Sequence, residues 1–194
     1  MKILSFLVSL FLVIGMTSCG GGDGEDQNDT GDEQANVSET KADETKDAED
    51  AGSVTIDLTD MSVPLKIEVP DGVEVNEGMM MGEFDGVQTY NYELKKDDWV
   101  MDVTMMDEDP YTDKEGYIAD YKDIVKSMEG FEEIVEEGEN GFIYKVTNED
   151  GEDYNFYYVV LKDDRAIEFE AGLKFTNFTL DEVKSMYEAA KSAS

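Results

Sequence analysis

The sequence LKIEVPDGVEV (residues 65–75) decides the fold. Its apolar residues alternate with charged ones on both sides of Pro70-Asp71-Gly72, which has the composition of a turn. A period of two residues is typical of strands that bury one face. The stretch therefore predicts two β-strands with a turn between them.

Working outward from this stretch, the same alternation recurs along the chain. It predicts further strands around residues 54–58, 90–94, 99–105, 131–137, 142–148, 154–162 and 166–171. Two segments change to the helical period, and each starts with a capping box, Thr112–Glu115 and Thr179–Glu182. The first of these helices is expected to reach Met128 and to end at Gly130. These elements predict an α+β domain over residues 53–194, in which an antiparallel sheet of seven or eight strands packs its apolar face against two helices.

The order of these elements also carries a resemblance. A strand ending in Val69-Pro70-Asp71-Gly72 is followed by further strands, a helix, several hairpins and a closing helix. In this order the domain resembles PsbP-like folds, including bacterial lipoproteins with that fold. The family often has Trp after the Pro-x-Gly turn, whereas this chain has Val73. Because the family is mostly non-enzymatic, the resemblance implies a binding or assembly domain and no particular site residue.

The composition excludes several classes of function. The 194 residues include 48 Asp or Glu, 15 Lys or Arg, one Cys and no His, which gives a formal charge of −33. Such a polyanion is repelled by nucleic acids and by anionic lipid headgroups. Without His or a second Cys, the chain has no Ser–His or Cys–His catalysis, no Cys/His zinc site and no intramolecular disulfide. We therefore expect a protein that is not an enzyme, has no cofactor and has no nucleic-acid partner.

The N-terminus has the pattern of a lipoprotein signal peptide. Lys2 precedes an apolar run over residues 3–16, which is too short to span a bilayer. The tetrapeptide Met16-Thr17-Ser18-Cys19 resembles the bacterial lipobox, although Leu is more usual than Met at its first place. The resemblance implies a signal peptide over residues 1–18, cleavage between Ser18 and Cys19, and a covalent diacylglycerol with further acyl chains on Cys19. An ordinary signal peptide with an incidental cysteine is the alternative, but an unused free thiol is a liability in an exported protein.

Residues 19–52 are expected to be the lipidated cysteine and an acidic, disordered tether. Residues 20–52 hold twelve acidic residues against Lys41 and Lys46, a formal charge of −10, and no aromatic residue. Such a segment cannot bury enough apolar surface to offset the entropy of ordering it. The tether is therefore predicted to keep the folded domain away from the membrane surface.

The run that follows Cys19 bears on location. Residues 19–26, CGGGDGED, look like the acidic export signal that takes lipoproteins of Bacteroidota to the outer face of the outer membrane. A solvated tether would have the same composition. The sequence thus predicts a lipid-anchored protein of the bacterial cell envelope, in the outer membrane, and leaves its outer and periplasmic faces open.

Carboxylates supply the candidate metal ligands. Two oxygen-rich loops, residues 107–113 and 148–153, contain candidate calcium ligands. These candidates are Asp107, Asp109, Asp150 and Asp153. Neither loop has the ligand spacing of an EF-hand calcium loop. The alternative interpretation is that each loop is a solvated turn that binds no metal. Paired carboxylates such as Asp163-Asp164 are expected in hairpin turns, where they lack the cleft and the raised pKa that acid–base catalysis needs.

Methionines form a second unusual group. Met79-Met80-Met81, and Met101 with Met105-Met106, could supply thioether ligands for copper(I). The run Met79-Met80-Met81 could equally be an adaptable apolar contact for a partner. Met101 and Met105 share the parity of Trp99 and are expected in the core.

Two functions stay open at the level of sequence. The first is a non-catalytic binding or assembly module with a protein, glycan or cation partner such as calcium. The second is a carboxylate-dependent hydrolase, which would need a cleft that holds two carboxylates, one of them with a strongly raised pKa.

Overall fold

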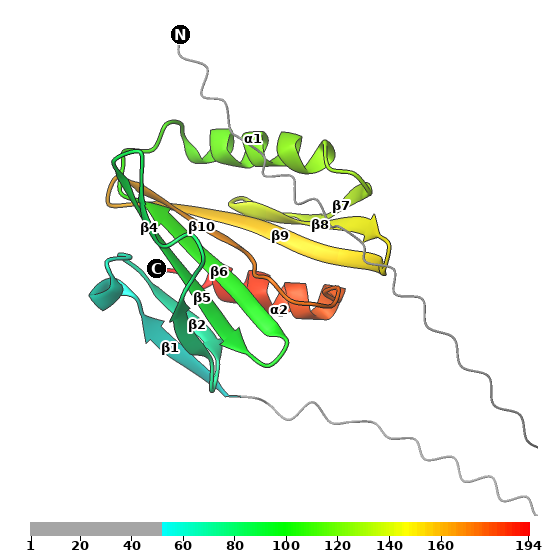
Figure 1. Cartoon of the computed structure of the whole chain (residues 1–194), viewed down its shortest axis with the longest axis horizontal. Helices are drawn as coiled ribbons and strands as arrows, with labels where there is room; N and C mark the ends of the chain where they lie inside the picture. The colour runs from blue at the N-terminus through cyan, green and yellow to red at the C-terminus, as the bar shows by residue number, and fades with distance from the viewer. Residues whose placement is uncertain (1–51) are drawn as a thin grey trace, which may run out of the picture. The chain divides into compact units, whose positions relative to one another are not determined.

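The computed structural model describes residues 52–194. Within this range the chain forms an antiparallel sheet of eight strands, a separate pair of strands and two α-helices, so the predicted α+β domain is confirmed (Figure 1). The predicted signal peptide, the lipidation site and nearly all of the predicted tether lie outside the described residues. No helix among residues 52–194 is long and apolar enough to cross a bilayer.

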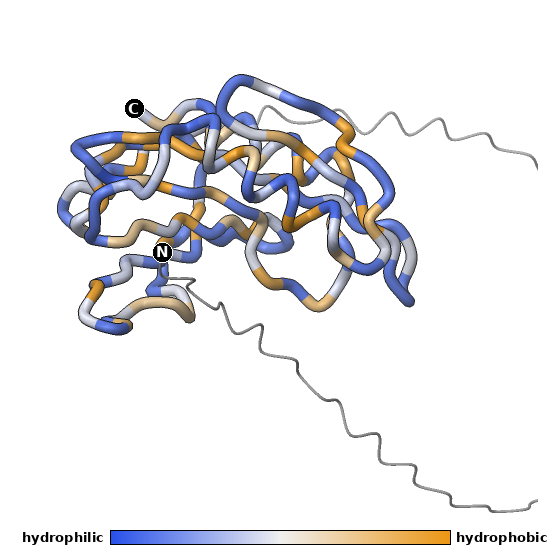
Figure 2. Tube along the Cα trace, turned by 90° about the horizontal axis from the view of Figure 1, so that it is seen from above, coloured by the Kyte–Doolittle hydropathy of each residue, from blue (hydrophilic) through white to orange (hydrophobic). Residues whose placement is uncertain are grey.

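The large sheet has the strand order β3-β5-β6-β10-β9-β8-β7, and β4 pairs with β5. Its strands are β3 (Glu74–Glu77), β4 (Gly82–Phe84), β5 (Val87–Lys96), β6 (Trp99–Met106), β7 (Phe131–Glu137), β8 (Gly141–Asn148), β9 (Gly151–Lys162) and β10 (Arg165–Ala171). Strands β1 (Ser53–Asp57) and β2 (Lys66–Pro70) form the separate pair, with a short 3₁₀ helix (Thr59–Met61) between them. Apolar and polar residues alternate along much of the chain trace (Figure 2).

The two strands predicted within residues 65–75 are present, but they do not pair with each other. Strand β2 pairs with β1, whereas β3 pairs with β5. The turn between them contains Gly72 at φ +83°, a conformation that favours glycine. The turn therefore passes the chain from the small sheet to the large one.

The helices α1 (Lys114–Lys126) and α2 (Leu180–Lys191) cover opposite faces of the large sheet (Figure 1). In β9, Phe156 and Tyr158 belong to the core that contains α2, whereas Tyr157 and Val159 belong to the core under α1. The alternating patterns predict one buried face, but β9 is buried on both. The unbroken apolar run at residues 156–160 is the sequence signal for this arrangement.

The helix ends agree only in part with the sequence. The capping box of Thr179 and Glu182 is present at the start of α2 and is confirmed. The predicted box at residues 112–115 is wrong, because Asp113 is the N-cap and its carboxylate accepts a hydrogen bond from the Gly116 N–H at 2.9 Å. Helix α1 ends at Lys126, so the predicted extension to Met128 is also wrong.

Two short acidic turns connect neighbouring strands. The predicted hairpin at Asp163-Asp164 is confirmed, with both residues at positive φ, 51° and 55°. Strand β4, which the alternation did not predict, turns into β5 through Asp85-Gly86, also at positive φ. Asp-Gly is a strong hairpin signal, because both central residues of this turn type need positive φ.

Candidate functional site

Helix α1 covers only part of its face of the sheet. It packs against β9, over an apolar cluster from β7, β8, β9 and β10. On β5, β6 and β10 the same face presents polar side chains in two rows across the strands. One row contains Asn91, Thr104 and Glu168, and the other contains Glu93, Asp102 and Glu170.

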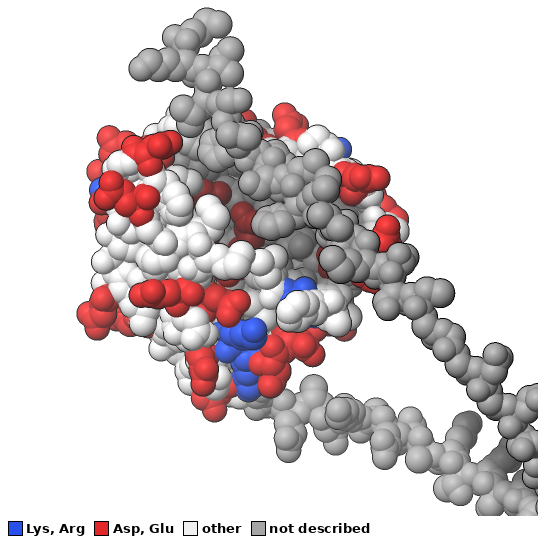
Figure 3. Space-filling view, in the orientation of Figure 1, with Lys and Arg blue, Asp and Glu red and all other residues white. Residues whose placement is uncertain are grey.

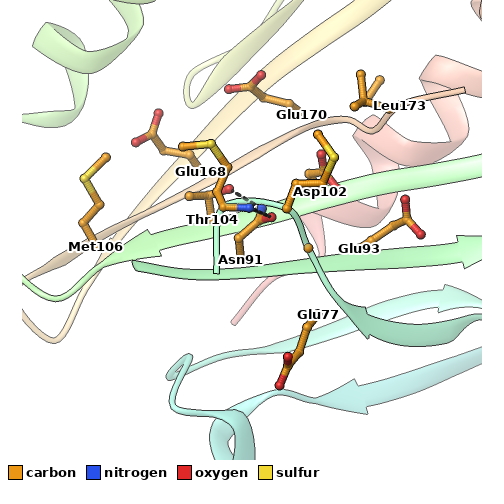
Figure 4. Close-up of a pocket in the computed structure, with 13 residues that line it drawn as sticks. Glu77, Asn91, Glu93, Asp102, Thr104, Met106, Glu168, Glu170 and Leu173 are labelled. Atoms are coloured by element: carbon orange, nitrogen blue, oxygen red, sulfur yellow. Dashed lines mark hydrogen bonds between the residues drawn. The ribbon is translucent and has the colours of Figure 1, made fainter. Parts of the chain in front are cut away.

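A pocket of about 660 Å³ lies over these two rows (Figure 4). Its lining combines carboxylates with thioethers and other apolar groups: Glu77, Gly78, Met79, Met80, Asn91, Glu93, Asp102, Thr104, Met106, Glu168, Glu170, Ala171 and Leu173. Concave sites with apolar walls and a few convergent polar groups are typical of ligand-binding pockets. This pocket is therefore the candidate functional site among the described residues.

Two tyrosines fix two of the glutamates of the pocket. Tyr121 of α1 donates a hydrogen bond to Glu170 at 2.8 Å, and Tyr157 of β9 donates one to Glu168 at 2.8 Å. The two rings are stacked, with centroids 3.9 Å apart and planes 9° apart. The stack therefore ties the position of both carboxylates to the packing of α1 on the sheet.

Burial in the pocket raises the pKa values of three of its carboxyl groups. Burial, reinforced by the charge of Glu93, raises the pKa of Asp102 to about 6. Burial raises the pKa of Glu170 to about 7, and the charges of Glu168 and Asp102 add to this, while the hydrogen bond from Tyr121 opposes it. Burial also raises the pKa of Glu168, against the hydrogen bond from Tyr157. Raised carboxyl pKa values of this kind cluster at functional sites.

The carboxylates of the pocket have no cationic partner among residues 52–194. The ion pairs in this range involve other acidic residues, and no Lys or Arg lines the pocket. A partly buried carboxylate without a counter-charge is costly, because desolvation is not offset by an ion pair. The arrangement can therefore accept positive charge from outside the domain.

The wall of the pocket on the β5 side is the loop over residues 78–81, which Asn91 holds in place. The buried Asn91 side chain accepts a hydrogen bond from the Met80 N–H at 3.1 Å and donates one to Thr104 Oγ1 at 2.9 Å. Gly78 passes so close to this amide that a Cβ there would overlap Asn91 Oδ1. Glycine at position 78 is thus required by the close approach rather than by its backbone angles.

Several methionines of the domain lie in one of two places, the core or the pocket, and the sequence predicts those of the core. Met101 and Met105 are buried in the core, which confirms their predicted position. Met79, Met80 and Met106 line the pocket. The loop methionines are therefore placed to contact a ligand, and copper(I) binding by their thioethers stays a prediction.

The four calcium candidates lie in two separate places. The Asp107 carboxylate forms an ion pair with Arg165 at 2.6 Å, and the Asp109 carboxylate lies 3.8 Å from the same guanidinium group. Asp150 lies in a tight turn between β8 and β9, and the Asp153 carboxylate accepts a hydrogen bond from the Phe178 N–H at 2.7 Å. The two places are at opposite ends of β9, whose twelve residues span roughly 35 Å.

The geometry therefore gives the calcium hypothesis no direct support. Within residues 52–194, no group of three or more Asp, Glu, His or Cys is arranged to hold a metal ion. Calcium binding stays a prediction. Ser18 and Cys19, the predicted cleavage and lipidation residues, lie outside the described part of the chain.

The sequence interpretation missed the carboxylates that form the site. Asp102 and Glu168 each lie between two buried apolar residues on a central strand, and Glu170 lies between the buried Phe169 and the half-buried Ala171. Charged residues are uncommon inside central strands, and this is the one signal that singles them out. Acidic side chains are spread over the visible face of the domain, whose formal charge is −24, so their number alone marks no site (Figure 3).

Comparison of the chain with protein-family models, with curated proteins and with solved structures found no match. The resemblance to PsbP-like folds and to bacterial lipoproteins therefore stays a prediction from the sequence.

Proposed function

We propose that the chain is a lipid-anchored binding protein of the bacterial cell envelope, without catalysis of its own, and that its pocket takes a positively charged ligand. The observation that carries the proposal is the group of three partly buried carboxylates, Asp102, Glu168 and Glu170, which no cation of the described residues neutralises. A bound cation would offset the desolvation of these groups.

The chemistry of the pocket favours an organic cation. Its carboxylates share the cavity with Met80, Met106 and Leu173, which offer apolar contact. A ligand with an ammonium or guanidinium group on a carbon chain would satisfy both parts of the lining. The charge would enter between the two rows of polar side chains, and the carbon chain would lie against the methionines.

The anchor follows from the N-terminal sequence. We propose lipidation at Cys19, an acidic tether over residues 20–52 and the bacterial outer membrane as the location. Two or three acyl chains make a durable anchor, whereas one is marginal. Protease treatment of intact cells distinguishes display on the outer face from a periplasmic location, because only a surface-displayed protein is cleaved before lysis.

Binding of a cation is tested with spermine as the probe. The purified full chain is expected to bind spermine in calorimetry near pH 7.5 and about 0.15 M salt, where surface charges are largely screened. Replacing Asp102→Asn together with Glu170→Gln should weaken binding at least about tenfold, because one charge-assisted contact contributes at least about 1.4 kcal/mol.

The matched control removes the same number of charges elsewhere. Asp97→Asn with Asp98→Asn changes two exposed residues in the β5–β6 turn. This variant should bind spermine within about twofold of the wild type, since exposed pairs contribute little. Equal weakening by both double variants, or no binding by the wild type, would contradict the proposal.

A carboxylate-dependent hydrolase is the second candidate, and one observation favours it. Asp102 and Glu170 lie directly opposite each other on β6 and β10, and their pKa values are raised to about 6 and about 7. Opposite residues have Cβ atoms roughly 5 Å apart, which is near the carboxyl separation of retaining glycosidases. In such a reaction Glu170 would be the general acid and Asp102 the nucleophile.

An assay of polysaccharide hydrolysis distinguishes the binding protein from the hydrolase. We expect the full chain to release no reducing ends from a panel of neutral and acidic polysaccharides. Release that Glu170→Gln lowers by about 100-fold or more, while Asp97→Asn with Asp98→Asn leaves it unchanged, would replace the binding proposal with catalysis.

A further inference from the structure

We propose that the pocket is the docking site for a basic segment of a partner protein. One Lys or Arg side chain of the segment enters between the carboxylates, and apolar residues on either side of it lie on the rim. The inference rests on the proposed function, because it requires the pocket to take a cation, and it extends that function by naming the kind of partner.

One side of the rim is an apolar loop that is held outward. Leu173 lines the pocket and is 67% exposed, and Phe175 is fully exposed. The loop itself is fixed, because Lys174 pairs with Glu182 at 3.0 Å and lies 4.1 Å from the ring centroid of Phe178. Leu173 and Phe175 are therefore presented to solvent by a fixed loop.

The other side of the rim is the methionine loop. Met79 is 84% exposed and Met80 is 54% exposed, although Asn91 fixes the backbone beneath them. Methionine adapts its shape to different partners and is common on protein-binding surfaces. Apolar groups on both sides thus flank the carboxylates of β5, β6 and β10.

The dimensions fit a polypeptide segment. The carboxylates occupy three neighbouring strands, which span roughly 10 Å at the usual strand spacing. In an extended peptide, residues i and i+4 lie on one side about 13 Å apart, with residue i+2 between them. An apolar–cationic–apolar pattern at this spacing would match the rim and the carboxylates together.

The extent of the apolar surface favours a protein over a small cation. A small ligand held within the pocket would leave much of Leu173 and Met79 in water, whereas a chain that crosses the pocket would cover them. Exposed apolar groups around a polar centre are typical of protein-binding sites. The pocket and its rim therefore form one surface.

Charge excludes two candidate occupants of the pocket, a second copy of the domain and the acidic segment of the same chain. A second copy of the domain carries a formal charge of −24, and residues 20–52 of the same chain carry −10. Both would bring negative charge to the carboxylates and be repelled. The occupant is thus a partner with local positive charge.

The inference is tested with matched synthetic peptides, each acetylated and amidated. The first probe is Leu-Ser-Lys-Ser-Leu, and its comparisons are Ser-Ser-Lys-Ser-Ser and Leu-Ser-Gln-Ser-Leu. Binding to the full chain is followed by NMR titration. The first probe should bind at least about fivefold more tightly than either comparison. Ser-Ser-Lys-Ser-Ser lacks the two leucines, whose partial burial contributes about 1 kcal/mol or more, and Leu-Ser-Gln-Ser-Leu lacks the charge-assisted contact.

Variants of the chain locate the contacts. Leu173→Ser with Phe175→Ser should weaken binding of the first probe at least about fivefold and abolish its preference over Ser-Ser-Lys-Ser-Ser. The matched control, Ile124→Ser with Met128→Ser, removes two exposed apolar residues on and just after α1 and should change neither.

Each outcome separates the two proposals. Spermine binding without a preference for the leucine-containing peptide, or a preference that survives Leu173→Ser with Phe175→Ser, overturns the docking site and leaves the cation pocket standing. If the wild-type chain binds neither spermine nor the leucine-containing peptide, the proposed function itself is overturned.

Discussion

Replacing Cys19 by alanine is expected to abolish lipid attachment completely. The predicted lipidation would use the thiol of this residue, the one cysteine in the chain, and signal peptidase II cuts lipoproteins only before a lipidated cysteine. The variant should therefore accumulate as an uncut precursor. Growth of producing cells in radioactive palmitate, followed by immunoprecipitation and electrophoresis, measures both the label and the size of the product.

A matched control keeps the cysteine and changes its neighbour. Met16→Leu restores the more usual first residue of the lipobox, so labelling and cleavage should continue at or above the level of the wild type. Unchanged palmitate labelling of the Cys19→Ala variant would rule out the lipoprotein assignment.

Replacing Glu170 by glutamine is expected to stabilise the domain at alkaline pH. The pKa of Glu170 rises from its ordinary 4.5 to about 7 on folding, because the side chain is buried beside other carboxylates. Between these two pH values the folded state binds more protons than the unfolded state, so stability falls as the pH rises. Above pH 7 the full cost of the ionised Glu170 is present.

The glutamine variant avoids this cost. Its amide oxygen can accept the hydrogen bond from Tyr121, and it does not ionise. The difference between a pKa of 4.5 and one of about 7 corresponds to about 3 kcal/mol, and residual solvent access reduces this to on the order of 2 kcal/mol. Urea unfolding near pH 8 should show this gain, and the gain should vanish near pH 4, below the unfolded pKa.

An exposed glutamate provides the comparison. Glu74→Gln on β3 removes one charge without burial and should change the free energy of unfolding by less than about 0.5 kcal/mol at either pH. A gain for Glu170→Gln that is the same near pH 4 and near pH 8 would show that packing, rather than ionisation, is responsible.

The sequence predicted the fold well because its signals are local. Alternation along residues 65–75 and the capping box at Thr179 each depend on neighbouring residues in the chain. Their physical causes, the two-residue period of a strand and the unpaired N–H groups of a first helical turn, act over the same short distance. Errors arose where two local choices compete, as at Thr112 and Asp113, which can both cap a helix.

The site could not be predicted in the same way, because its parts meet only through strand register. Asp102 and Glu170 lie opposite each other only after β10 pairs with β6, and no local pattern determines that pairing. Alternation does indicate that both face away from the α2 side of the sheet. A charged residue facing outward is usually solvated, however, and only the partial cover by α1 and the loop over residues 78–81 turns these positions into a pocket.

The hydrogen bonds of Asn91 have a consequence for the kinetics of binding. Because they fix the loop over residues 78–81 before any ligand arrives, a ligand does not bear the conformational entropy of ordering that loop, about 1 kcal/mol or more for each residue. Entry then requires no closing motion at this wall. Ligands of similar charge should therefore associate at similar rates, and their affinities should differ mainly in how slowly they leave.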